Sequence, residues 1–312
     1  MIDLSCNMHL KIAAYITCYQ DQESANRCIH SIESQSVQVK AIYIVDNSIN
    51  PLSLNNENEI LLVHHYPENI GIVGGLVKAL KWANDQEYDF LWTFDQDSIP
   101  SKDCLEILLD TYRKLSQQND YKVGIIAPTP SDLRTGKILE GAIFYRDRFQ
   151  GISHSNDVDY YECDAPITSG SLISLDAAKN VAYPCIDLFI DGIDLDYGFR
   201  LKQKGFHNLI SSKATMHHNY GNPIKVKFIN KYRHIQQYSA LRHYYICRNL
   251  TYLEIRFSQG YYRFTSLVQR LKYMFVNIFW IMLYDVDDKQ LKIWACLLGT
   301  CHGLIGKLGK IW

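Results

Sequence analysis

The chain has 312 residues, of which 47% are hydrophobic and 21% charged, and its formal net charge is -1. This composition excludes a disordered chain, a fibrous protein and a small disulfide-stapled domain. The near-zero total hides two opposed parts: residues 225–312 hold 14 Lys and Arg against 4 Asp and Glu, or +10, which leaves 18 against 29, or -11, for residues 1–224. Length and charge together predict one acidic domain over residues 1–224 with a basic extension over residues 225–312.

The first half of the chain alternates β-rich runs with helical patterns. Strands are expected at 11–17, 39–45, 60–65, 90–94 and 123–127, and helices at 22–35, 74–83, 102–117 and 193–204, with a β-rich, turn-rich stretch at 138–175. Such alternation predicts an α/β fold with a mostly parallel sheet flanked by helices. No internal repeat is evident.

The basic extension is expected to be helical from Lys225 onward. Between Phe264 and Met282, apolar residues recur at spacings of three and four, which predicts a helix with an apolar stripe. Two interpretations stay open: the stripe packs on the catalytic domain or a second subunit, or it lies on an anionic membrane surface. The apolar and basic residues of 291–312 favour the membrane.

Features of the sequence also suggest a cellular compartment. The nine cysteines contain no Cys-x-x-Cys pair, which indicates a reducing cytoplasm. Residues 1–10 lack the basic and apolar segments of a secretory signal. The longest apolar run, 274–284, is well short of the roughly 20 residues that a membrane-spanning helix needs.

Two carboxylates, Asp95 and Asp97, follow a predicted strand directly. Open α/β sheets bind ligands at the carboxyl ends of their strands, and a carboxylate pair can hold a hard divalent cation against a diphosphate. A surface turn is the alternative interpretation of this pair.

Asp46 follows another apolar strand. There it could accept a hydrogen bond from a ribose or a base, or it could form an Asx turn.

A Gly-rich segment runs from Asn69 through Gly71 to Gly75 and is expected to form a turn before a helix. Backbone amides at a helix entrance can receive phosphate. The segment is neither Gly-x-Gly-x-x-Gly nor a P-loop, which disfavours a dehydrogenase and an ATPase.

Three further carboxylates, Asp191, Asp194 and Asp196, stand at the start of a predicted helix. Acidic residues stabilise a helix N-terminus through its dipole, but one of these could act as a general base towards an acceptor hydroxyl. His217 and His218 are candidate metal ligands, although paired histidines are more often structural.

Together these positions resemble the family-2 glycosyltransferases, and among them the bacterial rhamnosyltransferases of surface polysaccharide synthesis. The motifs that carry the resemblance are Thr17-Cys18-Tyr19, Asp46-Asn47-Ser48, Asn69-x-Gly71, Asp95-Gln96-Asp97-Ser98-x-Pro100, Ser169-Gly170-Ser171, Asp194-Leu195-Asp196 with Arg200, His218-x-x-Gly221 and Arg242-x-Tyr244-Tyr245-x-x-Arg248-Asn249. The resemblance implies a GT-A fold that binds a nucleotide diphosphate sugar and inverts the anomeric carbon.

The resemblance also implies roles for single residues. Thr17, Tyr19, Asp46, Asn69, Gly71 and Asp95 would bind the donor, Asp97 and His218 would hold Mg²⁺ or Mn²⁺, Asp194 would be the catalytic base, and Ser169, Gly170, Asp191 and Asp196 would contact the acceptor. Ile193 stands where the family often has Glu, so Asp191 and Asp196 compete with Asp194 for the role of base. His217 competes with His218.

The expected reaction is transfer of a sugar, foremost L-rhamnose from dTDP-rhamnose, to a polyprenyl-diphosphate-linked glycan. UDP-galactofuranose, UDP-glucose or UDP-galactose are alternative donors, and a non-catalytic nucleotide-sugar-binding scaffold is the rival class. A scaffold would not need the carboxylates Asp95, Asp97 and Asp194. The expected location is peripheral, on the cytoplasmic face of the bacterial cell membrane, with a possible homo-oligomer and no nucleic acid partner.

Overall fold

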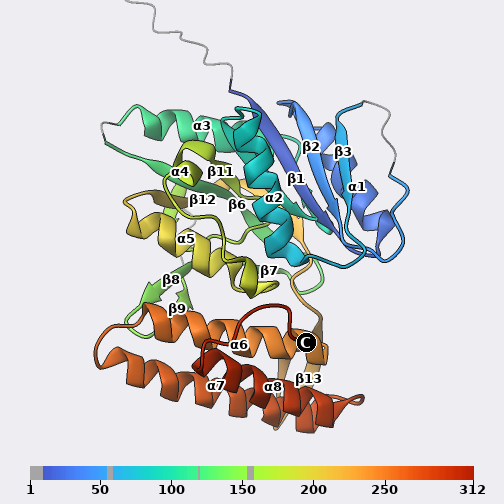
Figure 1. Cartoon of the computed structure of the whole chain (residues 1–312), viewed down its shortest axis with the longest axis vertical. Coiled ribbons are helices and arrows are strands. Elements are labelled where there is room, and N and C mark those ends of the chain that lie inside the picture. The colour runs from blue at the N-terminus through green and yellow to red at the C-terminus, as the bar shows by residue number, and fades with distance from the viewer. Residues whose placement is uncertain (1–9, 55–58, 119, 153–157) are drawn as a thin grey trace, which may run out of the picture.

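A computed structural model describes residues 10–54, 59–118, 120–152 and 158–312. Residues 1–9, on which the expectation of no secretory signal mainly rests, lie outside this set. Two layers of helices enclose a central sheet, and three long helices form a separate layer beyond its lower edge (Figure 1).

The central sheet is mixed and mostly parallel. Its main strands in spatial order are β10 (Tyr160–Cys163), β12 (His207–His218), β6 (Val123–Asp132), β11 (Leu172–Ser174), β4 (Phe90–Asp95), β1 (Ile12–Cys18), β2 (Ala41–Asp46) and β3 (Leu61–His65). β10 and β11 run antiparallel to their neighbours, and the other adjacent pairs are parallel. Short strands β5 (Ser98–Pro100) and β7 (Lys137–Ile138) pair with β12 and β6. The expected fold class is confirmed.

Both faces of the central strands β1, β2 and β4 are buried, which explains their continuous apolar runs, whereas the edge strand β3 is exposed beyond Leu61. Side chains alternate along β1: Ala14 and Ile16 pack against α1 (Gln22–Glu33) and α3 (Cys104–Ser116). Ala13 and Tyr15 pack against α2 (Gly71–Asp85), α4 (Leu175–Lys179) and α5 (Ile193–Gln203) on the other face.

The Gly-rich segment differs from the prediction. α2 begins at Gly71, so Gly74 and Gly75 lie inside the helix rather than in a turn before it. A Cβ on Gly75 would come within 2.3 Å of the Tyr15 hydroxyl, so this glycine permits the close approach of α2 to β1. The helix entrance itself lies at Gly71, where φ is +75°.

Residues 225–236 were expected to be helical, and this prediction is wrong. They belong to a hairpin of β13 (Pro223–Phe228) and β14 (Lys231–Gln236), in which Phe228 pairs with Lys231. Lysines alternate with apolar residues along β13, and this period of two fits a strand with one covered face. A second hairpin, formed by β8 (Ala142–Tyr145) and β9 (Arg148–Gly151), also lies outside the central sheet, and the short 3-10 helix η1 (Ile186–Leu188) precedes α5.

Helices α6 (Ala240–Phe257), α7 (Tyr262–Tyr284) and α8 (Lys289–Leu304) form the rest of the C-terminal region. α6 lies between the sheet domain and the other two helices (Figure 1). Within the described ranges, no helix combines the length and the apolar character needed to cross a bilayer.

α6 is joined to the sheet domain by a buried polar network centred on Arg248 and Asn249. The Arg248 guanidinium donates to the carbonyls of Asp187, Leu188 and Gly309. The Asn249 amide donates to the carbonyls of Leu188, Ile190 and Asp191. The network therefore fixes the segment 187–191 immediately before α5, and it also holds the C-terminal tail.

Replacing Arg248 with alanine is expected to lower the free energy of unfolding by about 3 kcal/mol, because buried carbonyls lose their donors. Arg256→Ala is the matched control, since Arg256 is an exposed arginine of the same helix, and it should change stability by less than about 0.5 kcal/mol. Thermal unfolding of both variants measures the difference. Equal melting temperatures would contradict the structural role of the network.

Candidate active site

Asp95, Asp97 and His218 come together at the carboxyl end of β4. β5 follows the two aspartates and pairs with the end of β12, where His218 stands opposite Ser98. One ligand atom from each of the three residues lies within 4.8 Å of the others. His218 Nδ1 is 3.3 Å from Asp97 Oδ1, and His218 Nε2 is 4.0 Å from Asp95 Oδ2. Two carboxylates and an imidazole suit a divalent cation such as Mn²⁺ or Mg²⁺.

Buried hydroxyl groups hold this cluster in place. Ser169 Oγ accepts a hydrogen bond from the Asp95 backbone amide at 3.0 Å and lies 2.6 Å from Ser98 Oγ. Ser98 Oγ is in turn 2.9 Å from His218 Nδ1. The side chain of Gln96 both accepts from and donates to the backbone of Tyr19, which ties the ends of β4 and β1 together.

The electrostatics of the cluster favour a bound cation. Burial raises the pKa of the Asp95 carboxyl, and the charge of Asp97 adds to the increase while His218 opposes it. Burial alone would lower the pKa of His218, but the hydrogen bond to Asp97 and the charges of both aspartates outweigh it and raise that pKa. Two close carboxylates beside one imidazole carry negative charge that a divalent cation would neutralise.

His217 points away from this cluster. Its Nδ1 lies 3.0 Å from Ser131 Oγ, and neighbouring residues of a strand face opposite sides of the sheet. The geometry therefore favours His218 over His217 as the metal ligand.

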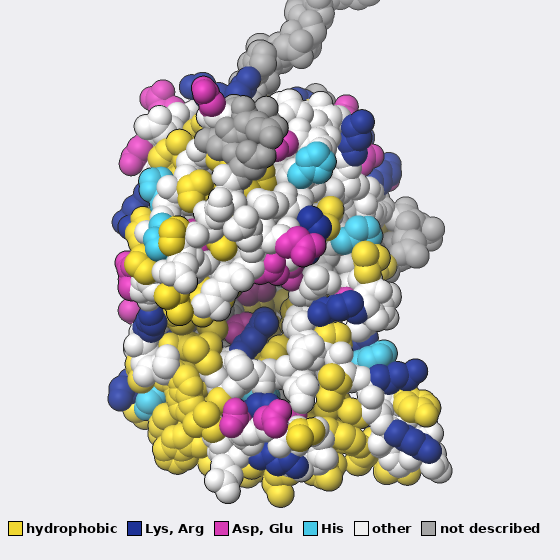
Figure 2. Space-filling view, turned by 90° about the vertical axis from the view of Figure 1, so that its right-hand side faces the viewer, with side chains coloured by type: hydrophobic (Ala, Val, Ile, Leu, Met, Phe, Trp, Pro, Cys, Tyr) yellow, Lys and Arg dark blue, Asp and Glu magenta, His cyan; other side chains and the backbone are white. Residues whose placement is uncertain are grey.

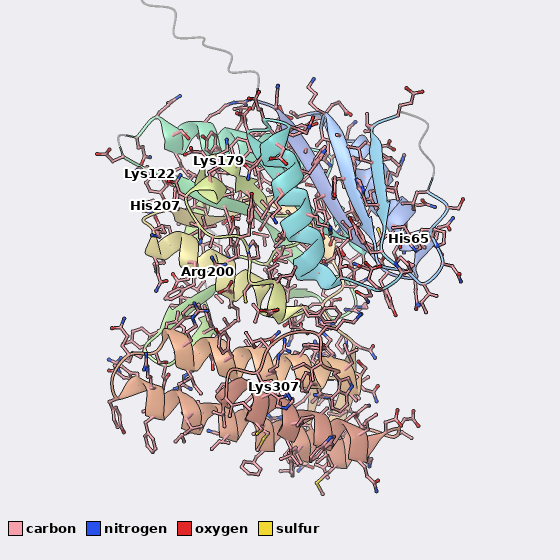
Figure 3. All side chains as sticks on the ribbon, in the orientation of Figure 1. His65, Lys122, Lys179, Arg200, His207 and Lys307 are labelled. Atoms are coloured by element: carbon pink, nitrogen blue, oxygen red, sulfur yellow. The ribbon has the colours of Figure 1, made fainter. Side chains whose placement is uncertain are left out.

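The three carboxylates near the start of α5 have different environments. Asp196 is 1% exposed, and its two oxygens accept hydrogen bonds from Arg200 at 3.1 and 2.7 Å. Arg200 lies on α5 in Figure 3. Asp196 is thus fully used in an ion pair between successive turns, which disfavours both of its predicted roles, base and acceptor contact.

Asp194 has the environment of a proton acceptor. Its Oδ1 accepts from the Leu195 amide at 3.0 Å. Burial raises the pKa of its carboxyl to about 6, and the charges of Asp191 and Asp95 add to the increase. A carboxylate with a pKa near neutrality is suited to general-base catalysis.

Asp191 lies beside Arg242 of α6. Arg242 Nη2 is 3.3 Å from Asp191 Oδ1, whereas Asp191 Oδ2 is buried without a hydrogen-bond partner among the described residues. Burial raises the pKa of Asp191, and Arg242 opposes the shift. Figure 2 shows acidic and basic side chains in a hollow between the sheet domain and the C-terminal helices. Arg242 belongs to a motif of the resemblance, but no role was predicted for it, because only the tertiary fold brings α6 beside Asp191.

The predicted donor-binding residues gather at the carboxyl ends of β1 and β2. Asp46 is fully buried, and its oxygens accept from the amides of Ser48 and Leu52 at 2.9 and 2.8 Å. Asn69 Oδ1 accepts from the Gly71 amide, the first residue of α2. Thr17 is buried nearby, whereas Tyr19 is 48% exposed. The structure gives Asp46 and Asn69 roles in shaping loops, and their contact with a donor stays a prediction.

Ser169 and Gly170 are buried behind the cluster of Asp95, Asp97 and His218. Ser169 is 2% exposed, and a Cβ on Gly170 would come within 2.8 Å of Met216 and Pro128. Their positions favour support of Asp95 rather than the predicted contact with an acceptor.

Comparison with known proteins agrees with this architecture. Residues 14–156 match the model of the family Glycosyl transferase family 2. No curated protein matches the sequence. The match and the fold support a nucleotide-sugar glycosyltransferase.

Among solved structures, residues 1–349 of TarS from S. aureus align with a TM-score of 0.54 and 13% identity, over 94% of this chain and 81% of that one. The complex of the same TarS fragment with UDP gives a TM-score of 0.51, 12% identity and coverage of 92% and 79%. GalNAc-T7 with UDP, GalNAc and Mn²⁺ aligns with a TM-score of 0.55 and 13% identity, over 68% of this chain but only 43% of that one. At such identities the likeness establishes the fold, which is that of GT-A glycosyltransferases.

Proposed function

We propose that this chain is an inverting, metal-dependent glycosyltransferase. The observation that carries the proposal is the placement of Asp95, Asp97 and His218 within 4.8 Å of one another, close enough to Asp194 that the charge of Asp95 raises the pKa of Asp194. A candidate metal site and a candidate base thus lie at one end of the sheet. The GT-A neighbours solved with UDP and Mn²⁺ support the same assignment.

In the proposed reaction, Asp194 takes the proton of an acceptor hydroxyl. The acceptor oxygen then forms a bond to the anomeric carbon of the donor sugar as the bond from that carbon to the diphosphate oxygen breaks. When bound at Asp97 and His218, the cation would neutralise charge on the leaving nucleoside diphosphate. Arg242 is placed to add a positive charge beside Asp191.

L-rhamnose from dTDP-rhamnose is the proposed donor sugar, and a polyprenyl-diphosphate-linked glycan of bacterial surface polysaccharide synthesis is the proposed acceptor. The support is the resemblance of the ordered motifs, from Asp95-Gln96-Asp97 to Arg248-Asn249, to bacterial rhamnosyltransferases. The proposed location is the cytoplasmic face of the cell membrane.

A mass-spectrometric screen of dTDP-, UDP- and GDP-sugars against lipid-linked acceptors tests this proposal. We expect a product larger than the acceptor by one deoxyhexose, formed only with dTDP-rhamnose and a divalent cation. A product larger by one hexose, formed from a UDP-sugar, would support glycosyl transfer but show that the donor is not dTDP-rhamnose. Donor binding without any product would favour the non-catalytic scaffold.

A further inference from the structure

Helices α7 and α8 both carry exposed apolar side chains, here termed the apolar face. Its members on α7 are Phe264, Val268, Phe275, Phe279 and Met282, and its members on α8 are Leu291, Trp294, Leu297 and Leu304. Exposed fractions reach 60% at Phe264, 62% at Phe275 and 55% at Trp294. Figure 2 shows hydrophobic side chains gathered at this end of the molecule.

Only some of the apolar side chains in the predicted stripe of α7, those along one of its edges, are buried inside the protein. Met274 and Ile281 are buried against Cys247 of α6 and Cys296 of α8, with Leu271 and Ile278 partly buried beside them. The other edge stays exposed from Phe264 to Met282, apart from the contact of Phe279 with Phe228. Large exposed apolar patches on soluble domains mark surfaces that bind another protein or a membrane.

A basic hairpin borders the apolar face. Phe228 of β13 packs against Phe279 and Trp280, with ring centroids 6.0 and 5.1 Å apart, and the Tyr284 hydroxyl donates to the Lys227 carbonyl. Four cations of the hairpin are exposed to solvent: Lys225, Lys227, Lys231 and Arg233. Lys231 is paired with Phe228 and so shares the face of the hairpin that packs on α7, whereas Lys225 and Lys227 lie on its outer face. The hairpin therefore holds an exposed basic surface at the border of the apolar face.

The charge of residues 225–312 distinguishes between a second copy of the chain and a membrane as the partner of the apolar face. Two of the four acidic residues of 225–312, Glu254 and Asp285, are buried beside Arg270 and Lys292. The other two, Asp287 and Asp288, lie in the loop between α7 and α8. A second copy related by a two-fold axis would present the same basic surface and bring like charges together, whereas anionic lipid headgroups attract such a surface.

We infer that the apolar face lies in the interfacial layer of a bilayer that contains anionic lipid, while the basic hairpin contacts the headgroups. The hairpin begins only five residues after His218, so the proposed docking would hold the metal cluster close to the membrane surface. That placement suits an acceptor carried on a lipid, and this last consequence rests on the proposed function.

Flotation of the full chain with vesicles tests the docking without any turnover, so its outcome is independent of sugar transfer. We expect binding to phosphatidylcholine vesicles that contain phosphatidylglycerol and much weaker binding to phosphatidylcholine alone. The double variant Phe275→Glu/Met282→Glu should reduce binding at least tenfold, about what one lost apolar anchor contributes. Lys225→Gln/Lys227→Gln should weaken binding to anionic vesicles about fivefold per lysine.

Matched controls lie at the far end of the molecule. Lys122→Gln/Lys179→Gln removes two exposed lysines there (Figure 3), and Val63→Glu changes an exposed apolar residue of β3. These variants should bind as the unchanged protein does, and thermal unfolding confirms that each variant folds.

Two results would overturn the inference. One is vesicle binding that the apolar and lysine variants leave unchanged. The other is a dimer in light scattering that Phe275→Glu/Met282→Glu converts to a monomer while vesicle binding persists, which would assign the face to a second copy.

Discussion

The Asp194→Asn variant is expected to lose sugar transfer while it keeps its affinity for the donor. An asparagine fills the same volume but cannot take a proton, and a positioned general base contributes about 10²–10⁴-fold to a rate. We therefore expect kcat to fall about a thousandfold or more, with the dissociation constant for the nucleotide changed by less than about twofold. Single-turnover transfer and calorimetry with UDP or dTDP measure the two quantities separately.

The pH dependence adds a second readout for Asp194. The base must be ionised to act, and burial raises its pKa to about 6. The rate of the unchanged enzyme should therefore rise with pH through about 6 and level off above it, and this acid limb should vanish in the residual activity of Asp194→Asn.

Two controls separate the base from its neighbours. Asp176→Asn changes an exposed carboxylate in the first turn of α4 and should have no effect on transfer. Asp196→Asn should lower the melting temperature, because it weakens the pair with Arg200. If Asp194→Asn turned over normally and Asp191→Asn did not, the base would be Asp191.

The placement of Asp95 and Asp97 was predictable because it depends on a local rule. Asp95 and Asp97 follow an apolar strand, and the carboxyl ends of parallel strands meet at one edge of a sheet. The choice between the histidines needed the fold. Only the pairing of β12 with β5 shows that His218, opposite Ser98, faces the aspartates.

Contacts between distant segments could not be predicted from spacing. Arg242 reaches Asp191 across 51 residues, and Gln96 reaches Tyr19 across 77. The pairing of Asp196 with Arg200 did carry a local signal, because residues four apart share a helix face. That spacing could have removed Asp196 from the candidates for the base.

The C-terminal region shows where periodicity helps and where it stops. The spacing of three and four correctly identified α7 as a helix, but it could not show that only one edge of the stripe is covered, because this depends on where α6 and α8 lie. The period-two pattern at Pro223–Phe228 was present in the sequence and indicated a strand. The prediction of a helix from Lys225 onward gave more weight to the basic and aromatic composition than to this pattern.

Loss of a metal ligand should have the second large effect. Asp97→Ala and His218→Ala are each expected to weaken Mn²⁺ binding by more than about a hundredfold, because removal of a partner outside the coordination sphere already costs 10–100-fold. Donor binding should then no longer respond to Mn²⁺, since the cation links the protein to the diphosphate in the proposed site. Calorimetry with Mn²⁺ alone, and with UDP or dTDP in the presence and absence of Mn²⁺, measures both effects.

His217→Ala is the matched control for His218→Ala. The two residues are neighbours on β12, but His217 contacts Ser131 rather than the aspartates. His217→Ala should therefore retain the Mn²⁺ affinity of the unchanged protein, which makes the pair of variants a test of side-chain direction as well as of metal binding. If Asp97→Ala and His218→Ala both kept their affinity for Mn²⁺, these residues would not be metal ligands. If both histidine variants lost the same affinity, the loss would come from damage to β12 rather than from a lost ligand.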